Sequence, residues 1–440
     1  MTSTDEDLHE DVRPQRQRLM VALAIAAMVP GVVIRIAGAH LSDPLSAVLF
    51  GLAIVGAAFL LSWAAEVAQL DISAGLAIAL LAFIAVLPEY AVDLVFALKG
   101  GNAFEKARFA GCPSGHPTEE SPCSLALANM TGANRLLIGV GWSMVVFLAW
   151  RQWKKRGDED AGKQIRLDRG HSVELSFLAV ATAYSLLIPL RGSITIVDAV
   201  VLVGLFVAYT VRISGAPAEE PHLVGPARWM GGFPRARRRA TVVGLFLLAA
   251  GVILLCAEHF AESLVGTGET LGVSEFLLVQ WLAPLASEAP ELLVAGLYAW
   301  RLNTNAGLGT LVSSKVNQWT LLVGTLPVAF AIASGSKHGL PIDAHQREEL
   351  FLTAAQSAFA VAVLINLSMS TREALQMFVL FIVQFIATAV GPESIHGDVR
   401  VVTAIIYLVL AARLFYRERA QIRPMLRDGF RTSYDELSAQ

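Results

Sequence analysis

Charged residues are scarce in this chain: Asp, Glu, Lys and Arg make up 16% of its 440 residues, against roughly 25% in ordinary soluble domains. Hydrophobic residues supply 55% of the chain, and the mean hydropathy is +0.57. A soluble protein of this length would show polar faces at helical period throughout. Apolar runs of about 18 residues or more recur instead, which is the length that spans a bilayer. The composition therefore indicates an integral membrane protein with helical spans.

The chain also lacks the short motifs of common enzymes and pumps. It has no glycine-rich phosphate-binding loop, so we do not expect ATP-driven pumping, and it has no HExxH, GxSxG or paired-cysteine metal motif. An intramembrane hydrolase would need a nucleophile or metal geometry that nothing in the sequence sets. We expect no enzyme activity, no cofactor, no nucleic-acid partner and no obligate protein partner.

Cysteine is rare, with three residues in the chain. Cys256 lies in an apolar run, where we expect a small buried side chain. Cys112 and Cys123 flank a short polar loop, CPSGHPTEESPC. They can form a disulfide if this loop faces an oxidising compartment, or they can remain two free thiols; the sequence leaves both open.

The apolar runs predict about twelve transmembrane helices, including a first span that is too long for a secretory signal. Proline, glycine and polar clusters separate the runs. The approximate bounds are 19–38, 44–66, 72–98, 124–150, 172–190, 194–212, 241–262, 272–299, 306–333, 350–368, 374–391 and 399–416.

Basic residues give these spans an orientation. With both termini in the cytoplasm, 24 of the 34 Lys and Arg residues fall on the cytoplasmic side and 7 on the outer side. The positive-inside rule predicts such a bias. We therefore expect a multi-pass protein of the plasma membrane with both termini cytoplasmic and the loop between Cys112 and Cys123 outside.

Two stretches of the chain repeat each other. Residues 81–98 and 282–300 each carry a Pro-Glu pair deep in a span. Each is followed by a span with small and polar residues near its start, 127–141 and 308–324. Each copy comprises about five spans, and an odd number makes the two copies enter the membrane from opposite sides. The sequence thus predicts an inverted repeat, which is common in secondary transporters.

The expected fold is an all-α polytopic membrane protein with two inverted five-helix repeats and one extra helix at each end. In secondary transporters of this architecture the substrate site lies near the bilayer midplane, between the repeats. The expected divisions are a cytoplasmic tail 1–18, an extra N-terminal span 19–43, a first repeat 44–212, a basic cytoplasmic loop 213–240, a second repeat 241–391, and an extra C-terminal span and cytoplasmic tail 392–440.

Four carboxylates lie in the Pro-Glu segments. Glu89 and Glu291 each follow a proline directly, Asp93 shares a helix face with Glu89, and Glu288 is three residues before Glu291. Each proline frees a backbone carbonyl, which must find another partner in lipid. One charge at mid-membrane costs about 2.5–3.5 kcal/mol, so these acids must be paired, protonated or bound to a cation. Their oxygens suit Na⁺ and Ca²⁺, whereas a lone acid of this kind is often a protonated core residue.

The spans that follow offer further oxygen ligands. Amide and hydroxyl oxygens can coordinate a cation, although small polar residues also commonly pack helix against helix. For any single Ser or Thr, packing is the alternative reading. The candidates are Asn129, Thr131, Asn134, Thr310, Ser313, Ser314 and Asn317.

A Pro-Glu span paired with a small-polar span, present twice, resembles the alpha repeats of the calcium/cation antiporter superfamily. This is the sodium/calcium exchanger membrane region, here in a divergent bacterial-type form. The resemblance covers 44–150 and 241–333 closely. In such proteins the Pro-Glu glutamates are central ion ligands and the next span faces them. The resemblance therefore marks Glu89, Glu291 and Asn134, with Ser314 or Asn317 in the second copy.

Two departures from that pattern concern the ion. The family usually has a small hydroxyl residue two positions before the proline, where this chain has Val86 and Glu288. Arg135 and Lys315 are intramembrane bases at matching places of the two repeats. Either both act as tethered cations in the site, with Lys315 able to lose its proton when desolvated, or both snorkel to a surface. We expect the former because the bases recur in both repeats.

The sequence predicts a secondary antiporter that exchanges Ca²⁺ or another metal cation for Na⁺ or H⁺ by alternating access. Its partners are these cations and the lipid bilayer. The alternative is a Na⁺/H⁺ exchanger with little or no Ca²⁺ transport, since built-in bases leave room for fewer mobile charges. The expected metal ligands are Glu89, Asp93, Asn134, Glu288, Glu291, Ser314 and Asn317, with Arg135 and Lys315 as charge-compensating or proton-coupling groups.

Overall fold

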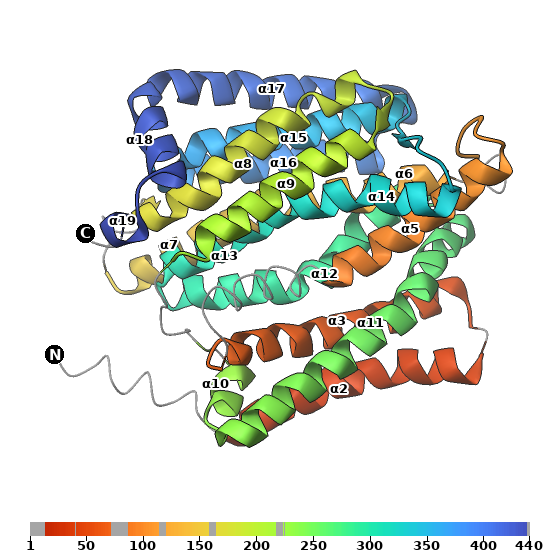
Figure 1. Cartoon of the computed structure of the whole chain (residues 1–440), viewed down its shortest axis with the longest axis horizontal. Coiled ribbons are helices and arrows are strands. Elements are labelled where there is room, and N and C mark those ends of the chain that lie inside the picture. The colour runs from red at the N-terminus through yellow and green to blue at the C-terminus, as the bar shows by residue number, and fades with distance from the viewer. Residues whose placement is uncertain are drawn as a thin grey trace.

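The computed structural model describes residues 14–39, 41–71, 87–113, 120–157, 164–216, 223 and 225–437 (Figure 1). The first part of the expected span 72–98, with Val86, lies outside the described residues. Within them the chain is nearly all helical, as the sequence predicts.

The first half of the chain contributes seven of the described helices. Helix α6 continues into α7 through a π-helical turn, Leu137–Trp142. The bounds are α2 (Pro14–Ala37), α3 (Asp43–Ala68), α5 (Leu87–Lys106), α6 (Pro122–Leu136), α7 (Ser143–Lys155), α8 (Ser172–Ser185) and α9 (Ile196–Ile213), with 3-10 turns at Arg169–His171 and Ile188–Leu190.

The second half repeats the π-helical feature, because α13 continues into α14 through Gln318–Leu322. It also adds helices in the basic loop and the C-terminal tail that the sequence reading did not foresee. The bounds are α10 (Pro226–Gly231), α11 (Arg235–Leu271), α12 (Glu275–Trp300), α13 (Thr304–Asn317), α14 (Val323–Ser334), α15 (Ala344–Leu364), α16 (Thr371–Val390), α17 (His396–Arg417), α18 (Arg419–Phe430) and α19 (Tyr434–Leu437), with a 3-10 turn at Glu393–Ile395.

Four short strands join the two halves of the chain. Strand β1 (Gln164–Arg166) pairs antiparallel with β4 (Ser368–Ser370), and Ile165 lies opposite Met369. Strand β2 (Ser193–Ile194) pairs antiparallel with β3 (Leu340–Pro341). The sequence did not predict them; they lie where helices end, and there the pairing satisfies backbone groups that the helices cannot.

Nine helices within the described residues are long and apolar enough to cross a membrane. Helices α12 and α15 occupy the expected spans 272–299 and 350–368 but are not among these nine. The polytopic helical class is therefore confirmed, while the expected count of about twelve is not. Helix α11 has 37 residues and extends well beyond the expected span 241–262 at both ends.

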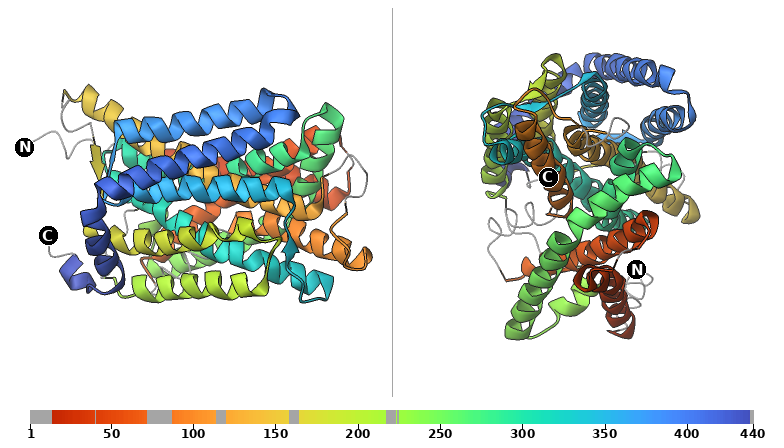
Figure 2. Two further views of the ribbon diagram at one scale, coloured as in Figure 1. Left: turned by 90° about the horizontal axis from the view of Figure 1, so that it is seen from above. Right: turned by 90° about the vertical axis from the view of Figure 1, so that its right-hand side faces the viewer.

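The helices form layers that run roughly side by side (Figures 1 and 2). Helices α2, α3 and α11 form one outer layer, α15, α16 and α17 lie at the opposite edge, and α5, α6, α12 and α13 lie between. The contact of α2 with α3 is close because a Cβ at Gly56 would lie 2.4 Å from the Ala24 carbonyl oxygen. Small residues commonly bring membrane helices together in this way.

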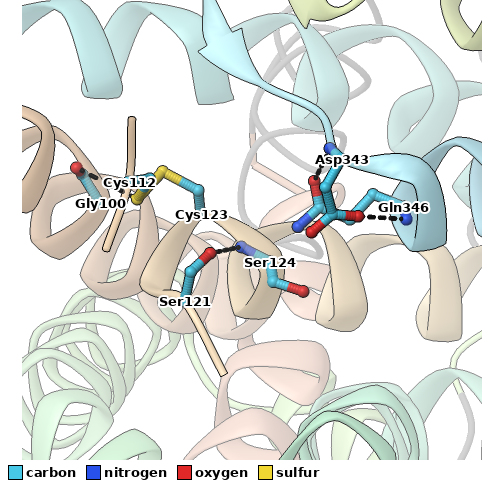
Figure 3. The surroundings of a disulfide bond; sticks show 7 residues. All are labelled: Gly100, Cys112, Ser121, Cys123, Ser124, Asp343 and Gln346. Carbon is cyan, nitrogen blue, oxygen red and sulfur yellow. Dashed lines mark hydrogen bonds between the residues drawn. A yellow bond between two sulfur atoms is a disulfide. The ribbon is translucent and has the colours of Figure 1, made fainter. Parts of the chain in front are cut away.

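A disulfide links Cys112 to Cys123 (Figure 3). Cys112 follows α5 and Cys123 lies in the first turn of α6, so the bond ties together two helices of the central layer. A Cβ at Gly100 would lie 2.9 Å from the Cys123 sulfur, so this approach requires glycine. Of the two alternatives that the sequence left open, the structure has the bond; Cys256 is buried as expected.

Candidate cation-binding site

Two buried glutamates meet in the central layer. Glu89 comes from α5 and Glu288 from α12, and both are nearly inaccessible to solvent. Gln318, in the π-helical turn after α13, donates from Nε2 to Glu89 Oε1 at 3.3 Å and also to Glu288 Oε1. One amide from the second half thus bridges carboxyl groups from both halves of the chain.

The other carboxyl oxygens of this pair have no donor. Oε2 of Glu89 and Oε2 of Glu288 are buried and accept no hydrogen bond from any described N–H or O–H group. Both carboxyl groups accept from the same Gln318 amide, so they lie side by side. Two ionised carboxylates that lie side by side in a buried site repel each other unless a proton or a cation compensates them. The pair can therefore hold either a proton or a cation between its oxygens.

Glu291 occupies a different place from its repeat counterpart, Glu89. It is half-buried, and its Oε2 atom is enclosed without a described donor. It lies within electrostatic range of both Glu89 and Glu288. The residue that meets Glu89 on Gln318 is thus Glu288, the acid at which the chain departs from the family pattern.

Asp93 lies one helical turn beyond Glu89 on α5 and is buried. Its Oδ1 accepts from Asn129 Nδ2 on α6 at 2.6 Å, and its Oδ2 has no described donor. The Asn129 amide holds the carboxylate from one side, and the other oxygen remains available. Asp93 therefore extends the acidic site along α5.

Lys315 lies on α13 and is fully buried. Its Nζ donates to the Asn134 carbonyl oxygen at 2.8 Å and to Asn134 Oδ1 at 2.6 Å. The ammonium lies within electrostatic range of Glu288 and Glu89, and 5.2 Å from the Trp319 ring centre. Lys315 thus binds oxygens of the first half of the chain much as a mobile cation would.

Arg135 does not contact the acidic site as Lys315 does, although the two bases occupy matching positions after the two Pro-Glu segments. Its Nη1 forms an ion pair with Glu349 Oε2 of α15 at 2.7 Å, and its Nη2 donates to Gln384 Oε1 of α16. The guanidinium is buried and does not reach a surface. The sequence left two alternatives: two tethered cations in one site, or two bases that snorkel to a surface. Neither alternative describes both residues.

The remaining candidates divide by side-chain direction. Ser314 and Asn317 are buried on α13, near Lys315 in sequence. Ser313 instead exchanges a 2.8 Å hydrogen bond with the Tyr209 hydroxyl on α9, and Thr310 bonds to the carbonyl oxygen of its own helix at Ala306. These two hydroxyl groups serve packing, which was the alternative reading for them.

Sequence reasoning missed Gln318, the residue that bridges the acids. Position 318 is three residues after Lys315 and shares its face in an α-helix, so the same periodicity could have marked it. The π-helical turn that begins at Gln318 widens the helix and changes the direction of the side chains that follow. A π-helical turn occurs at the matching place after α6, and such turns are frequent at functional sites.

The donor set of this site suits a hard cation. It consists of carboxyl, amide and carbonyl oxygens, which Na⁺ and Ca²⁺ prefer. Within the described ranges, no group of three or more His, Cys, Asp or Glu side chains is placed to hold a metal ion. Binding of a cation would therefore rely on backbone and amide oxygens besides the acids.

Comparisons with known proteins agree with this chemistry. The chain matches the sodium/calcium exchanger protein family over residues 44–215 and 241–390. The crystal structure of the H⁺/Ca²⁺ exchanger CAX is 39% identical, has a TM-score of 0.84, and the match covers 96% of this chain and 98% of that one. The structure of native YfkE, 14% identical with a TM-score of 0.56, covers 89% of this chain and 100% of that one and shows the fold alone.

No curated protein sequence matches the chain. The family match nevertheless extends over most of its length, and CAX is similar over nearly all of it. The chain therefore belongs to the sodium/calcium exchanger family within the calcium/cation antiporter superfamily, and it is a polytopic membrane antiporter of cations.

Proposed function

We propose that this antiporter exchanges Ca²⁺ for H⁺ by alternating access across the plasma membrane. The supporting observation is that Glu89 and Glu288 accept from the same Gln318 amide, so two buried carboxyl groups lie side by side and repel unless a proton or a cation compensates them. A divalent cation needs both carboxylates ionised. Because proton and Ca²⁺ use the same oxygens, each displaces the other, which couples their transport. The similar exchanger CAX, described as an H⁺/Ca²⁺ exchanger, favours the same pair of ions.

The proposed ligands include the whole acidic set. Glu89 and Glu288 form the centre, and Asp93 and Glu291 supply further carboxylate oxygens. Asn134, Ser314 and Asn317 contribute neutral oxygens from α6 and α13. The two inverted repeats, 44–212 and 241–391, would alternate access to this centre, with both termini cytoplasmic.

Lys315 supplies the observation that favours a second candidate, a Na⁺/H⁺ exchanger with little Ca²⁺ transport. Its ammonium already occupies oxygens that a mobile cation could use. One built-in positive charge leaves less negative charge for a divalent ion. In the leading proposal Lys315 compensates part of the acidic charge; in the second, it excludes Ca²⁺ altogether.

Ion flux into proteoliposomes distinguishes these candidates. The purified full chain is reconstituted, and uptake of Ca²⁺, Mn²⁺, Mg²⁺, Na⁺ and K⁺ is followed with and without a pH gradient. We expect Ca²⁺ uptake driven by an outward H⁺ gradient in Na⁺-free medium. Uptake that requires a Na⁺ gradient would replace H⁺ by Na⁺ as the coupling ion, and Na⁺/H⁺ exchange without Ca²⁺ uptake would establish the second candidate.

A further inference from the structure

A second buried charged cluster lies beside the cation site and has no part in the proposed exchange. Its centre is Glu349 on α15, which is 3% exposed. Glu349 Oε2 accepts from Arg135 Nη1 at 2.7 Å and from Gln280 Nε2 of α12 at 2.9 Å. Its Oε1 lies 3.7 Å from Arg400 Nη1 of α17 and 4.0 Å from His345 Nε2.

The charges of this cluster balance among themselves. Arg135 and Arg400 are always protonated, and Glu349 and Glu348 oppose them; Arg400 Nη2 reaches Glu348 Oε2 at 2.8 Å. The cluster therefore needs no mobile cation, unlike the pair of Glu89 and Glu288.

Arg135 is held on several sides. Besides Glu349, its guanidinium contacts Gln384 of α16 and lies 5.2 Å from the Trp281 ring centre of α12. Gln356 Nε2 of α15 donates to the Arg135 carbonyl oxygen at 3.3 Å. A planar guanidinium with five donors is suited to such fixed, many-sided contact. The rotation of α6 about its own axis is thereby fixed relative to α12, α15 and α16.

The residue before Arg135 belongs to the cation site. Successive residues of an α-helix point about 100° apart, so Asn134 faces a different neighbour. That neighbour is Lys315, which Asn134 holds by two oxygens. A rotation of α6 that released Arg135 would also turn Asn134 away from Lys315.

We propose that Arg135 and Glu349 are positioning residues for cation binding. Their buried pair anchors α6 to the bundle of α15 and α16, and so keeps Asn134, and through it Lys315, aligned with the acidic pair. This role rests on the proposed function, because it concerns the affinity of the same site. It also assigns the two mirrored bases separate tasks, since Lys315 lies in the site and Arg135 orients the helix that holds it.

The test removes the pair without leaving a lone buried charge. In the double variant Arg135→Met/Glu349→Leu both charges are replaced by apolar groups, a change that buried ion pairs often tolerate without loss of stability. We expect the melting temperature to stay near that of the wild type, while the KM for Ca²⁺ rises at least tenfold with a smaller change in maximal rate. Hydrogen exchange across α6 should increase in parallel.

Two further variants make the outcome decisive. Glu262→Gln removes a carboxylate outside the cluster, which is 50% exposed and pairs with Lys99, and it should leave the KM within about twofold. If the melting temperature of the double variant is lower than that of the wild type, Arg135→Lys takes its place. This variant keeps the positive charge but loses the planar guanidinium, and its KM for Ca²⁺ should likewise rise. A wild-type KM in the folded double variant, or in Arg135→Lys where the double variant is unstable, would overturn the proposal.

Failure of the proposed function has a different signature. In that case wild-type proteoliposomes take up no Ca²⁺ under a pH gradient, whatever the variants do. Hydrogen exchange in α6 still responds to Arg135→Met/Glu349→Leu if the anchor exists, because that readout does not depend on transport. Unchanged exchange in α6 would overturn the anchor by itself.

Discussion

The Lys315 ammonium contacts Asn134 through two of its protons, one to the backbone oxygen at 2.8 Å and one to the side-chain oxygen at 2.6 Å. The two residues come from opposite halves of the chain and are 181 positions apart. The contact therefore joins the two halves of the chain inside the proposed site, and it places the Lys315 side chain beside the acids.

Lys315→Ser should raise the affinity for Ca²⁺. Removing a positive charge within electrostatic range of Glu288 and Glu89 strengthens their attraction for a divalent ion. We expect at least tenfold tighter binding, equivalent to about 1.4 kcal/mol, by titration calorimetry on the purified protein. Lys315→Arg, which keeps the charge, is the matched control. Equal affinities in all three proteins would show that Lys315 does not compensate the acids.

Glu288→Gln should reduce Ca²⁺ uptake into proteoliposomes to background. The amide keeps the size of the side chain and can still accept from Gln318, but it carries no negative charge and cannot share a proton with Glu89. Glu89→Gln should behave alike. Glu262→Gln is a suitable control, because Glu262 is half-exposed and pairs with Lys99. Transport at the wild-type rate in both site variants would show that the site is elsewhere.

Gly132→Ala should destabilise the protein. A Cβ there would lie 1.7 Å from the Gln280 carbonyl oxygen, which Pro284, lacking an N–H, leaves without its helical donor. Helices α6 and α12 would have to separate, and overpacking of this kind costs about 1–3 kcal/mol or more. We expect a lower melting temperature and less Ca²⁺ uptake. Gly204→Ala on α9, where nothing lies within 4 Å, should melt like the wild type.

Reduction of the bond between Cys112 and Cys123 should also lower the melting temperature. The bond closes a loop with a sequence separation of 11. In the chain-entropy model, a cross-link of this length stabilises the folded state by about 3 kcal/mol, because it restricts the unfolded chain. The Cys112→Ser/Cys123→Ser variant should melt at the same temperature with and without reductant. If reductant did not change the melting temperature of the wild type, the disulfide would not contribute the expected stability.

Asp71, which pairs with Arg238 and Arg239 of α11, gives a prediction for how stability depends on pH. Hydrogen bonding from Arg238, with the charges of Arg238 and Arg239, lowers the pKa of Asp71 from 3.8 to about 2. The folded state therefore holds the ionised form, so the stabilisation is complete above about pH 3.8 and is lost as the pH falls through 2.

The melting temperature of Asp71→Asn should accordingly be lower than that of the wild type between pH 5 and 7. The difference should shrink only below about pH 4, as Asp71 of the wild type takes up its proton. Glu436→Gln, an exposed substitution in α19, provides the control for general acid effects. A difference that is constant down to pH 2 would show that the ion pairs contribute nothing.

Much of the architecture was accessible from the sequence, because hydrophobic length and the distribution of Lys and Arg act locally along the chain. Apolar runs predicted helices close to their observed bounds, for example 374–391 for α16 and 194–212 for α9. The four short strands were not accessible. They pair segments about 150 to 200 residues apart, and two or three residues carry no periodicity of their own.

For the site, the sequence singled out Glu89, Glu288, Asn134 and Lys315, because charged and amide side chains within apolar runs are costly and therefore conspicuous. It paired the acids by the symmetry of the Pro-Glu motif and so emphasised Glu291. The structure instead brings Glu288 to Glu89 and leaves Glu291 half-buried. Which of these two residues of α12 faces the centre depends on how that helix is rotated and packed.

Composition and the length of the apolar runs are enough to identify a helical membrane protein and the residues that are too polar for lipid, since both follow from the cost of transferring groups into hydrocarbon. The partners of those residues depend on how the helices pack in three dimensions. Two bases in matching positions, Arg135 and Lys315, have different counterparts because α6 and α13 present them to different neighbours, Glu349 in one case and Asn134 in the other. Helix rotation and the π-helical turns set these directions, and neither is encoded in spacing along the chain.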